Sequence, residues 1–277
     1  MALQVDPIKQ QLRSVATIAG ALPNHVNITG ILAEGGQGII YAGTINGERA
    51  AIKTYFPGQL QKRIEREIDA LRAMRSERIA RLLWNGTIII DRQQLIVVAT
   101  TYIAGDPLNK VVARGTLPYS QIAQLACDVA QAIGSMWGML IVHRDLKPSN
   151  IVIQPSGNAC VIDLGYARHI GLTTLTAPGF TSGTWGYMSP EQMKGVHQLT
   201  CKSDIYALGI ILLECGLGHH PTGGDQLALQ SSNLHLQLPA ELRSWPAADL
   251  IKKCLHPEPA ARPKPAKLLD AFCGPTR

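Results

Sequence analysis

Apolar and polar residues alternate along several segments between residues 27 and 101. Alternation with a period of two predicts strands that have one buried face. The pairs Asn46-Gly47 and Asp91-Arg92 separate consecutive segments, and both favour tight hairpin turns. The predicted strands cover residues 28–32, 39–45, 49–55, 82–90 and 95–101. Together they predict a small five-stranded antiparallel sheet.

Helical periodicity replaces alternation in other parts of the chain. Residues 59–75 place Ile64 and Ile68 on one stripe beneath a charged face, which predicts a helix among the strands. Residues 119–137 have the pattern of a long amphipathic helix, and residues 205–213 are apolar all round, as in a buried helix. Two short strands are predicted at residues 151–153 and 160–162. The fold class predicted is α+β, with a larger, mainly helical part after the sheet.

The composition is that of a folded chain, because 46% of its 277 residues are hydrophobic and 17% are charged. Residues 1–26 precede the first strand and are expected to form a helical extension. The formal net charge is +6 with the basic residues dispersed, which argues against nucleic-acid binding. No apolar stretch reaches the roughly 18 residues of a membrane span. We therefore expect no stable membrane insertion and a cytoplasmic location.

Six cysteines are widely spaced and form no CxxC pair. A chain of this length can stabilise itself through its core without disulfides. We therefore expect all of them to be reduced thiols, mostly in the core: Cys127, Cys160, Cys201, Cys215, Cys254 and Cys273.

A glycine-rich turn joins the first two predicted strands, where residues 32–40 read LAEGGQGII. Glycines let backbone N–H groups approach phosphate oxygens, although most glycine-rich hairpins are only turns. Lys53 follows on the third strand and Glu67 on the next helix, so they could form an ion pair near phosphates. Two plainer interpretations stay open. Lys53 could be a solvated edge residue, and Glu67 could be a surface partner of Arg63.

The strongest signal lies in the predicted helical part. Residues 141–150 read IVHRDLKPSN, and a DLG sequence begins at Asp163, 13 residues after Asn150. Three further motifs follow in order: GTWGYMSPE at residues 183–191, DIYALG at 204–209 and RP at 262–263. From residue 28 to 272 the chain resembles the eukaryotic-type (Hanks-type) protein kinase family, including its prokaryotic members. Chance can produce one such motif, but not the whole series in the family's order.

The resemblance implies the bilobal protein-kinase fold. The expected limits are a small lobe at residues 27–101, a hinge at 102–106 and a large lobe at 107–277. It also implies a serine/threonine kinase, because Lys147 and Thr184 match the residues that this class places near the catalytic aspartate. Such an enzyme transfers the γ-phosphate of Mg·ATP to hydroxyl groups of protein substrates.

The family's mechanism gives roles to individual residues. The catalytic residues that it implies are Asp145, Lys147, Asn150, Lys53 and Glu67. Asp145 would orient the substrate hydroxyl and accept its proton, and Lys147 would steady the γ-phosphate. Asn150 and Asp163 would hold Mg²⁺, or Mn²⁺ in its place.

The same resemblance implies an ATP site on the small lobe and hinge. Lys53 would contact the α- and β-phosphates and pair with Glu67. Because Glu67 follows Lys53 by only 14 residues, Glu65 is kept as an alternative partner. Gln37 stands where the family usually has an aromatic residue at the tip of the glycine-rich loop. The residues expected to bind ATP are Leu32, Gly35, Gly38, Ile40, Ala51, Lys53, Thr101, Ile103, Asp106 and Val152.

Hydroxyl residues are frequent between Asp163 and Glu191, and Arg144 directly precedes Asp145. In the family, that arginine helps bind a phosphate on this segment, which can order the loop. We therefore expect autophosphorylation, with Thr176 or Thr181 as candidates, and a transient homodimer in which it takes place. The other expected partners are proteins that carry Ser or Thr.

Two alternative functions stay open. A pseudokinase scaffold would bind nucleotide without turnover, but such proteins commonly lack one of four residues that are all present: Lys53, Asp145, Asn150 and Asp163. A small-molecule kinase would share the fold. However, kinases of that kind have a His-Gly-Asp motif that is not followed by Lys-Pro, and they lack the Ser-Pro-Glu segment that this chain has. Protein kinase activity is the prediction that the motifs favour.

Overall fold

The computed structural model describes residues 7–59, 61–165, 167–169, 183–196 and 198–274. The chain forms two compact units. The sheet unit consists of Met1–Arg72 and Ala80–Tyr102, and the helical unit consists of Ala73–Ile79 and Ile103–Arg277. Each unit is described by itself.

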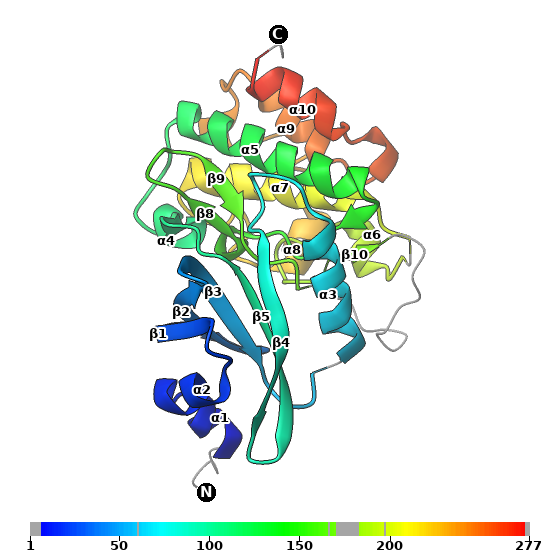
Figure 1. Ribbon diagram of the computed structural model, residues 1–277. Coiled ribbons are helices and arrows are strands. Elements are labelled where there is room, and N and C mark those ends of the chain that lie inside the picture. Colours follow the sequence, from blue (N-terminus) through cyan, green and yellow to red (C-terminus); the bar gives the residue numbers. More distant parts are fainter. Residues whose placement is uncertain (1–6, 60, 166, 170–182, 197, 275–277) are drawn as a thin grey trace, which may run out of the picture. The chain divides into compact units, whose positions relative to one another are not determined.

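The sheet unit is built on five antiparallel strands in the order β1-β2-β3-β5-β4 (Figure 1). Their bounds are β1 Val26–Gly35, β2 Gly38–Ile45, β3 Glu48–Tyr55, β4 Leu82–Ile90 and β5 Gln93–Thr101. Asn46 and Gly47 have φ angles of 50° and 86°, and Asp91 and Arg92 have φ angles of 47° and 62°. Turns with two left-handed residues match the twist of paired strands, so both predicted hairpins form. The predicted sheet is confirmed, and helix α3 (Gln61–Ala73) is the predicted helix among the strands.

The N-terminal extension is helical, as predicted, and forms α1 (Pro7–Leu12) and α2 (Val15–Ala21). The Ser14 side chain caps α2 by accepting a hydrogen bond from the Thr17 N–H. Leu12 and Ile18 are completely buried in the same apolar core as strand residues such as Tyr41. Figure 1 shows both helices beside the sheet. The extension is therefore part of the sheet unit and not a separate tail.

The helical unit contains seven α-helices among the described residues. These are α4 Leu108–Val112, α5 Tyr119–Gly138, α6 Pro190–Met193, α7 Cys201–Leu217, α8 Gln226–Ser231, α9 Ala248–Cys254 and α10 Pro265–Phe272. Helix α7 is buried along most of its length and packs against both α5 and α9. A Cβ atom at Gly209 would lie 2.9 Å from Leu255 Cδ2 and 3.0 Å from Cys254 Cβ, so α7 packs closely against the end of α9 at this glycine.

Short strands and 3-10 turns complete the helical unit. Strands β6 (Asp106–Pro107), β8 (Ile151–Ile153) and β9 (Ala159–Val161) form one small sheet, and β7 (Ile141–Val142) pairs with β10 (Arg168–His169). The 3-10 turns are η1 Pro148–Asn150, η2 Ala240–Leu242 and η3 Pro259–Ala261. The predicted short strands correspond to β8 and β9, so the α+β class is confirmed.

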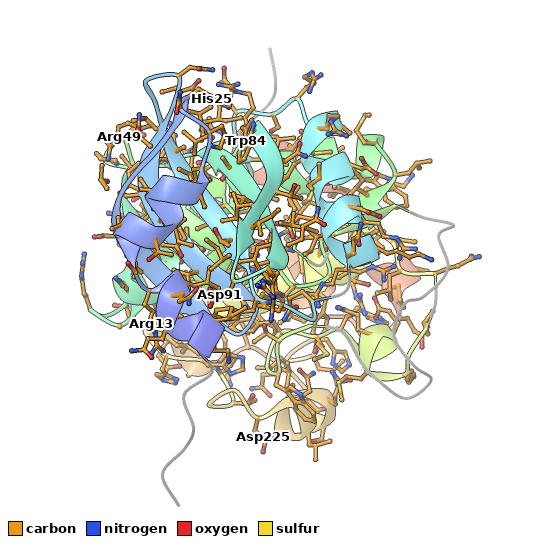
Figure 2. All side chains as sticks on the ribbon, turned by 60° about the horizontal axis from the view of Figure 1, so that its bottom comes forward. Arg13, His25, Arg49, Trp84, Asp91 and Asp225 are labelled. Atoms are coloured by element: carbon orange, nitrogen blue, oxygen red, sulfur yellow. A yellow bond between two sulfur atoms is a disulfide. The ribbon has the colours of Figure 1, made fainter. Side chains whose placement is uncertain are left out.

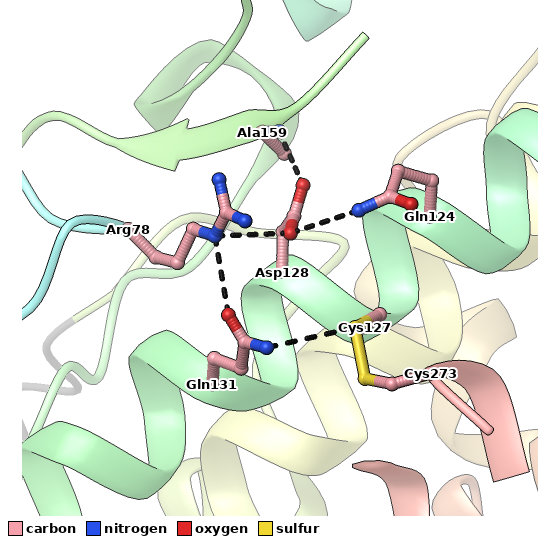
Figure 3. Close-up of a disulfide and its surroundings, with 7 residues drawn as sticks. All are labelled: Arg78, Gln124, Cys127, Asp128, Gln131, Ala159 and Cys273. Atoms are coloured by element: carbon pink, nitrogen blue, oxygen red, sulfur yellow. Dashed lines mark hydrogen bonds and ion pairs between the residues drawn. A yellow bond between two sulfur atoms is a disulfide. The ribbon is translucent and has the colours of Figure 1, made fainter. Parts of the chain in front are cut away.

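A disulfide joins Cys127 on α5 to Cys273 just after α10 (Figure 3). The prediction that all six cysteines are reduced was wrong for this pair. The two residues are 146 positions apart in sequence, but α10 packs along α5 and brings their Cα atoms to 5.3 Å, which is within disulfide range. The other cysteines are free and buried, as predicted: Cys160, Cys201, Cys215 and Cys254.

Candidate active site

Two polar side chains of the helical unit, Thr184 and Lys147, contact the Asp145 carboxylate. The Thr184 hydroxyl donates to Asp145 Oδ1 at 2.7 Å and accepts from Lys147 Nζ at 2.6 Å. Lys147 Nζ also lies 2.9 Å from Asp145 Oδ2, and the Asp145 side chain is only 4% exposed. Both carboxylate oxygens therefore have a fixed partner, which holds the carboxylate in one orientation.

The backbone beside Asp145 is held from α7. Asp204 accepts hydrogen bonds from the N–H groups of His143 at 2.9 Å and Arg144 at 3.0 Å. Arg144 has a left-handed φ of 71°, which is uncommon for a long side chain and needs such support. Burial raises the pKa of Asp204, and the nearby His143 charge and the two N–H donors oppose that rise. The Asp204 carboxylate thus fixes the turn that presents Asp145.

Asn150 and Asp163 lie at neighbouring points of the β8–β9 hairpin. The Asn150 carbonyl accepts a hydrogen bond from the Ile162 N–H at 3.0 Å, directly before Asp163. The Asn150 amide Nδ2 donates to the Asp145 carbonyl at 2.9 Å, which orients the amide group. Its Oδ1 atom is an acceptor of the kind that binds a hard cation.

The acceptor groups of Asn150 and Asp163 fit Mg²⁺ better than a metal that needs a complete protein cage. No group of three His, Cys, Asp or Glu side chains that could hold a metal occurs among the described residues. Mg²⁺ commonly uses one or two carboxylates together with waters and substrate phosphates. A site with Asn150 and Asp163 as its protein ligands would match that coordination preference.

The glycine-rich loop of the sheet unit has one open part and one crowded part. A Cβ atom at Gly35 or Gly36 would meet nothing within 4 Å. At Gly38 it would lie 2.1 Å from the Thr54 carbonyl oxygen, so β2 can approach β3 only with glycine there. Gly38 is therefore explained by strand packing, whereas the surroundings of Gly35 and Gly36 are open.

Lys53 is a central-strand residue with several partners in the sheet unit. Its side chain is 15% exposed, and its Nζ lies 3.9 Å from Glu67 Oε1, a distance that makes a loose ion pair. Nζ also donates to Gln37 Oε1 at 3.1 Å and lies 4.6 Å from the centre of the Tyr55 ring. The interpretation of Lys53 as a solvated edge residue is therefore wrong.

Glu67 is buried, with a side chain only 6% exposed, so it is not a surface residue. Glu65 is exposed and accepts a hydrogen bond from Gln61 Nε2 at 2.8 Å. Of the two glutamates considered as partners of Lys53, Glu67 is the one in ion-pair range.

The residues expected around the adenine ring and ribose divide between the two units. In the sheet unit, Ala51 lies opposite Thr100 on the β3–β5 ladder, and the Thr101 N–H donates to the Arg81 carbonyl at 2.9 Å. That bond leaves the Thr101 carbonyl as the group that could accept from a base. Leu32 is 44% exposed. Ile40 is half-buried on β2.

In the helical unit, β6 pairs with β8, so that Asp106 lies opposite Ile153 and Pro107 lies opposite Val152. Asp106 also forms an ion pair of 2.8 Å with Arg114. Ile103 is half-buried at the start of this unit. The roles of these residues in nucleotide binding stay predictions.

Comparison with known proteins agrees with this geometry. The family model described as "Protein kinase domain" matches residues 26–272. The chain belongs to the protein kinase family. The predicted resemblance is thus confirmed over most of the sequence.

The relatives of this kinase domain include bacterial serine/threonine-protein kinases. It is 35% identical over 258 residues to the serine/threonine-protein kinase AfsK of Streptomyces coelicolor, an alignment that covers 87% of the chain and 30% of AfsK. It is 31% identical over 254 residues to the probable serine/threonine-protein kinase PkwA of Thermomonospora curvata, covering 86% of the chain and 32% of PkwA. The chain therefore spans about a third of the length of these curated relatives.

The kinase domain contains a buried ion pair that joins two of the sequence motifs. Arg262 makes two hydrogen bonds to the Glu191 carboxylate, at 2.7 and 2.8 Å, and its side chain is 0% exposed. Its other hydrogen bonds go to the backbone carbonyls of Lys202, His256 and Pro257. Burial opposes ionisation of Glu191, but the bonds and charge of Arg262 and a bond from Ser203 hold the Glu191 pKa below its usual value. The pair is fully satisfied, as a buried ion pair must be.

Sequence reasoning missed another buried carboxylate in the kinase domain, Asp128 (Figure 3). Asp128 on α5 is completely buried and accepts bonds from Arg78 Nε at 3.0 Å, Gln124 Nε2 at 3.0 Å and the Ala159 N–H at 2.7 Å. These contacts fix the segment around Arg78 and strand β9 to α5. An aspartate beside the apolar stripe of a long helix is the signal that could have found it.

The candidate phosphorylation sites Thr176 and Thr181 lie outside the described residues. Thr184, by contrast, is described and occupies the position that the motif predicts.

Proposed function

We propose that this domain transfers the γ-phosphate of Mg·ATP to Ser and Thr hydroxyls of proteins. The single observation that carries the proposal is the set of short contacts among Asp145, Lys147 and Thr184. It supplies an oriented carboxylate to receive a proton, and an ammonium group beside it to stabilise negative charge. The bacterial relatives named as serine/threonine-protein kinases support the same reaction.

In this reaction the substrate hydroxyl oxygen attacks the γ-phosphorus, and the bond from that phosphorus to the β–γ bridging oxygen breaks. ADP leaves, and the hydroxyl proton passes to Asp145. Lys147 would neutralise charge on the transferred group, while Thr184 keeps both side chains in place. Mg²⁺ supplies positive charge to the phosphates, and Asn150 and Asp163 would hold it.

On the sheet unit, Lys53 would bind the α- and β-phosphates and Glu67 would orient Lys53. The open backbone at Gly35 and Gly36 would admit the phosphates. The residues that the sequence predicts for the adenine and ribose would bind those groups. Mn²⁺ is proposed as a substitute for Mg²⁺, because oxygen ligands accept both ions.

Partners and location are further parts of the proposal. No helix in the described ranges is long and apolar enough to cross a membrane. We infer a cytoplasmic location, where ATP is abundant, and a transient homodimer for autophosphorylation. The Cys127–Cys273 disulfide argues against the cytoplasmic location, because disulfides are rare in reducing compartments. Trapping free thiols in intact cells before lysis would show whether the two cysteines are oxidised where the protein is found.

Transfer of labelled γ-phosphate from Mg·ATP to the domain and to a generic basic protein tests the proposal directly. The native chain is expected to label both, and Asp145→Asn is expected to lose about 10²- to 10⁴-fold in rate, the range for a general base. Nucleotide affinity, measured separately, should be unchanged in the variant. Nucleotide binding without transfer in the native chain would refute the proposal and indicate a scaffold.

A further inference from the structure

The N-terminal helices bring two cationic side chains to the glycine-rich loop. Lys9 and Arg13 are four residues apart and follow one another along α1 and its end. Figure 2 labels Arg13 on this extension and Asp91 on the β4–β5 turn, with which Gln11 forms a hydrogen bond. The Tyr41 hydroxyl donates to the Leu12 carbonyl, next to Arg13. The extension is thus anchored to the sheet at the two residues that directly precede Arg13.

Arg13 forms a bidentate ion pair with Glu34, the residue directly before the loop glycines. Its Nε donates to Glu34 Oε2 at 2.9 Å and its Nη2 donates to Glu34 Oε1 at 2.9 Å. A two-bond contact between guanidinium and carboxylate fixes orientation as well as distance. The hydrogen bonds from Arg13 lower the Glu34 pKa, so the carboxylate is charged at neutral pH. Glu34 is therefore tied to the extension directly before Gly35.

Lys9 contacts Phe56, whose backbone is hydrogen-bonded to the tip of the loop. Its Nζ lies 4.9 Å from the centre of the Phe56 ring, within the range of a cation–π contact. The Phe56 N–H donates to the Gln37 carbonyl at 2.8 Å, which holds the loop tip against the end of β3. The Gln37 side chain in turn accepts from Lys53 Nζ at 3.1 Å. Contacts therefore run from α1 through the loop tip to Lys53.

We propose that α1 and α2 are a positioning element for the glycine-rich loop, in which Arg13 holds Glu34 at the start of the loop, Lys9 packs on Phe56 beside its tip, and Gln37 links the tip to Lys53. The proposal rests on the proposed function, since it assigns these residues to the nucleotide side of the same site. None of them needs to touch the reacting atoms. Their effect is to reduce the number of loop conformations that compete with the one that binds phosphate, which strengthens nucleotide binding.

The first experiment measures MgATP affinity by displacement of a fluorescent nucleotide from the full chain. Arg13→Gln and Glu34→Gln are each expected to weaken binding by about 2- to 5-fold, the range for an exposed ion pair of good geometry. The double variant should be no weaker than either single variant, because both remove one contact. Lys252→Gln is the matched control, since it breaks another exposed ion pair, with Asp249 in the helical unit. It should leave the affinity unchanged.

A second readout separates positioning from a general loss of stability. Amide hydrogen exchange of residues 34–38 should become faster in Arg13→Gln, while the thermal midpoint stays close to that of the Lys252→Gln control. In phosphate-transfer assays, KM for ATP should rise and kcat at saturating ATP should stay within about twofold.

Unchanged nucleotide affinity and loop exchange in Arg13→Gln and Glu34→Gln would overturn the inference, as would additive losses in the double variant. These outcomes are independent of catalysis. A chain that binds nucleotide but transfers no phosphate would refute the proposed function, yet it would still show whether the extension positions the loop.

Discussion

The two groups of predicted site residues differ in how firmly they are built. Around Asp145 in the helical unit, side chains meet at 2.6 to 2.9 Å and the carboxylate is almost fully buried. In the sheet unit, Lys53 and Glu67 are 3.9 Å apart and the space beside Gly35 and Gly36 is open. A group that receives a proton must be held in one orientation. The Asp145 carboxylate meets this demand within the helical unit itself, whereas the glycine-rich loop depends on contacts from the N-terminal helices for its position.

The largest expected effect comes from breaking the ion pair that supports the rigid unit. Arg262→Met would leave the buried Glu191 carboxylate without its charged partner, at a cost of about 3–5 kcal/mol in the free energy of unfolding. Denaturant unfolding followed by tryptophan fluorescence measures this loss. Lys252→Met, in which the exposed Asp249 loses its partner, is the control and should have a much smaller effect, because solvent screens an exposed ion pair. Equal effects in the two variants would show that the buried pair does not stabilise the helical unit.

The disulfide should also matter for the helical unit. Replacing both Cys127 and Cys273 by Ala removes a cross-link between residues 146 positions apart and is expected to lower the unfolding free energy by about 2–4 kcal/mol. The expected loss should appear as a lower denaturant midpoint without reductant, and the native chain should show a similar decrease after reduction. A native chain that reacts with thiol reagents at both positions without reductant would contradict the bond itself.

Thr184 tests whether short contacts around Asp145 are needed for turnover. Thr184→Val keeps the shape and removes the hydroxyl, so about 1.5–3 kcal/mol of charge-assisted hydrogen bonding is lost, or roughly 10- to 100-fold in rate. Thr184→Ser should restore most of the activity. Steady-state phosphate transfer with ATP affinity measured in parallel gives the result. A Val variant as active as the Ser variant would mean that the hydroxyl does not orient Asp145.

The smallest effect is expected in the loose pair of the sheet unit. Glu67→Gln should raise KM for ATP by about 3- to 10-fold, because roughly 1 kcal/mol of ion pairing with Lys53 is lost. Glu65→Gln is the matched control on the same helix and should have no effect, since Glu65 is exposed and bonded to Gln61. A larger rise in KM for Glu65→Gln than for Glu67→Gln would show that Glu65, and not Glu67, is the partner of Lys53.

Much of the fold follows from local patterns in the sequence. All five strands of the sheet and the long α5 helix were predicted, because their periodicity extends over many residues. The apolar run at residues 205–213 predicted only the middle of α7, which begins at Cys201 after the Thr200 cap and ends before Gly218, whose φ is 75°. Because helix caps are polar residues or glycine, a search for apolar residues alone underestimates the length of the helix at both ends.

Other features depend on partners that are distant in sequence. Strands β6, β7 and β10 have two residues each, too few to show any period. The Asp128 contacts and the Cys127–Cys273 bond arise where α5 meets segments far along the chain. The sequence showed that Gln37 departs from the family pattern, but its bond to Lys53 depends on how the loop folds over β3.

The same disulfide gives the helical unit a closed covalent topology. The backbone from Cys127 to Cys273 forms a ring, and Asp145, Asn150, Asp163 and Thr184 all lie within it. A single proteolytic cut anywhere in that ring would leave the fragments joined, so the nicked protein would migrate as one species until reductant is added. A pulling force applied to the chain before Cys127 and after Cys273 would be transmitted through the disulfide. The backbone segment that holds these four residues would then carry little of the force.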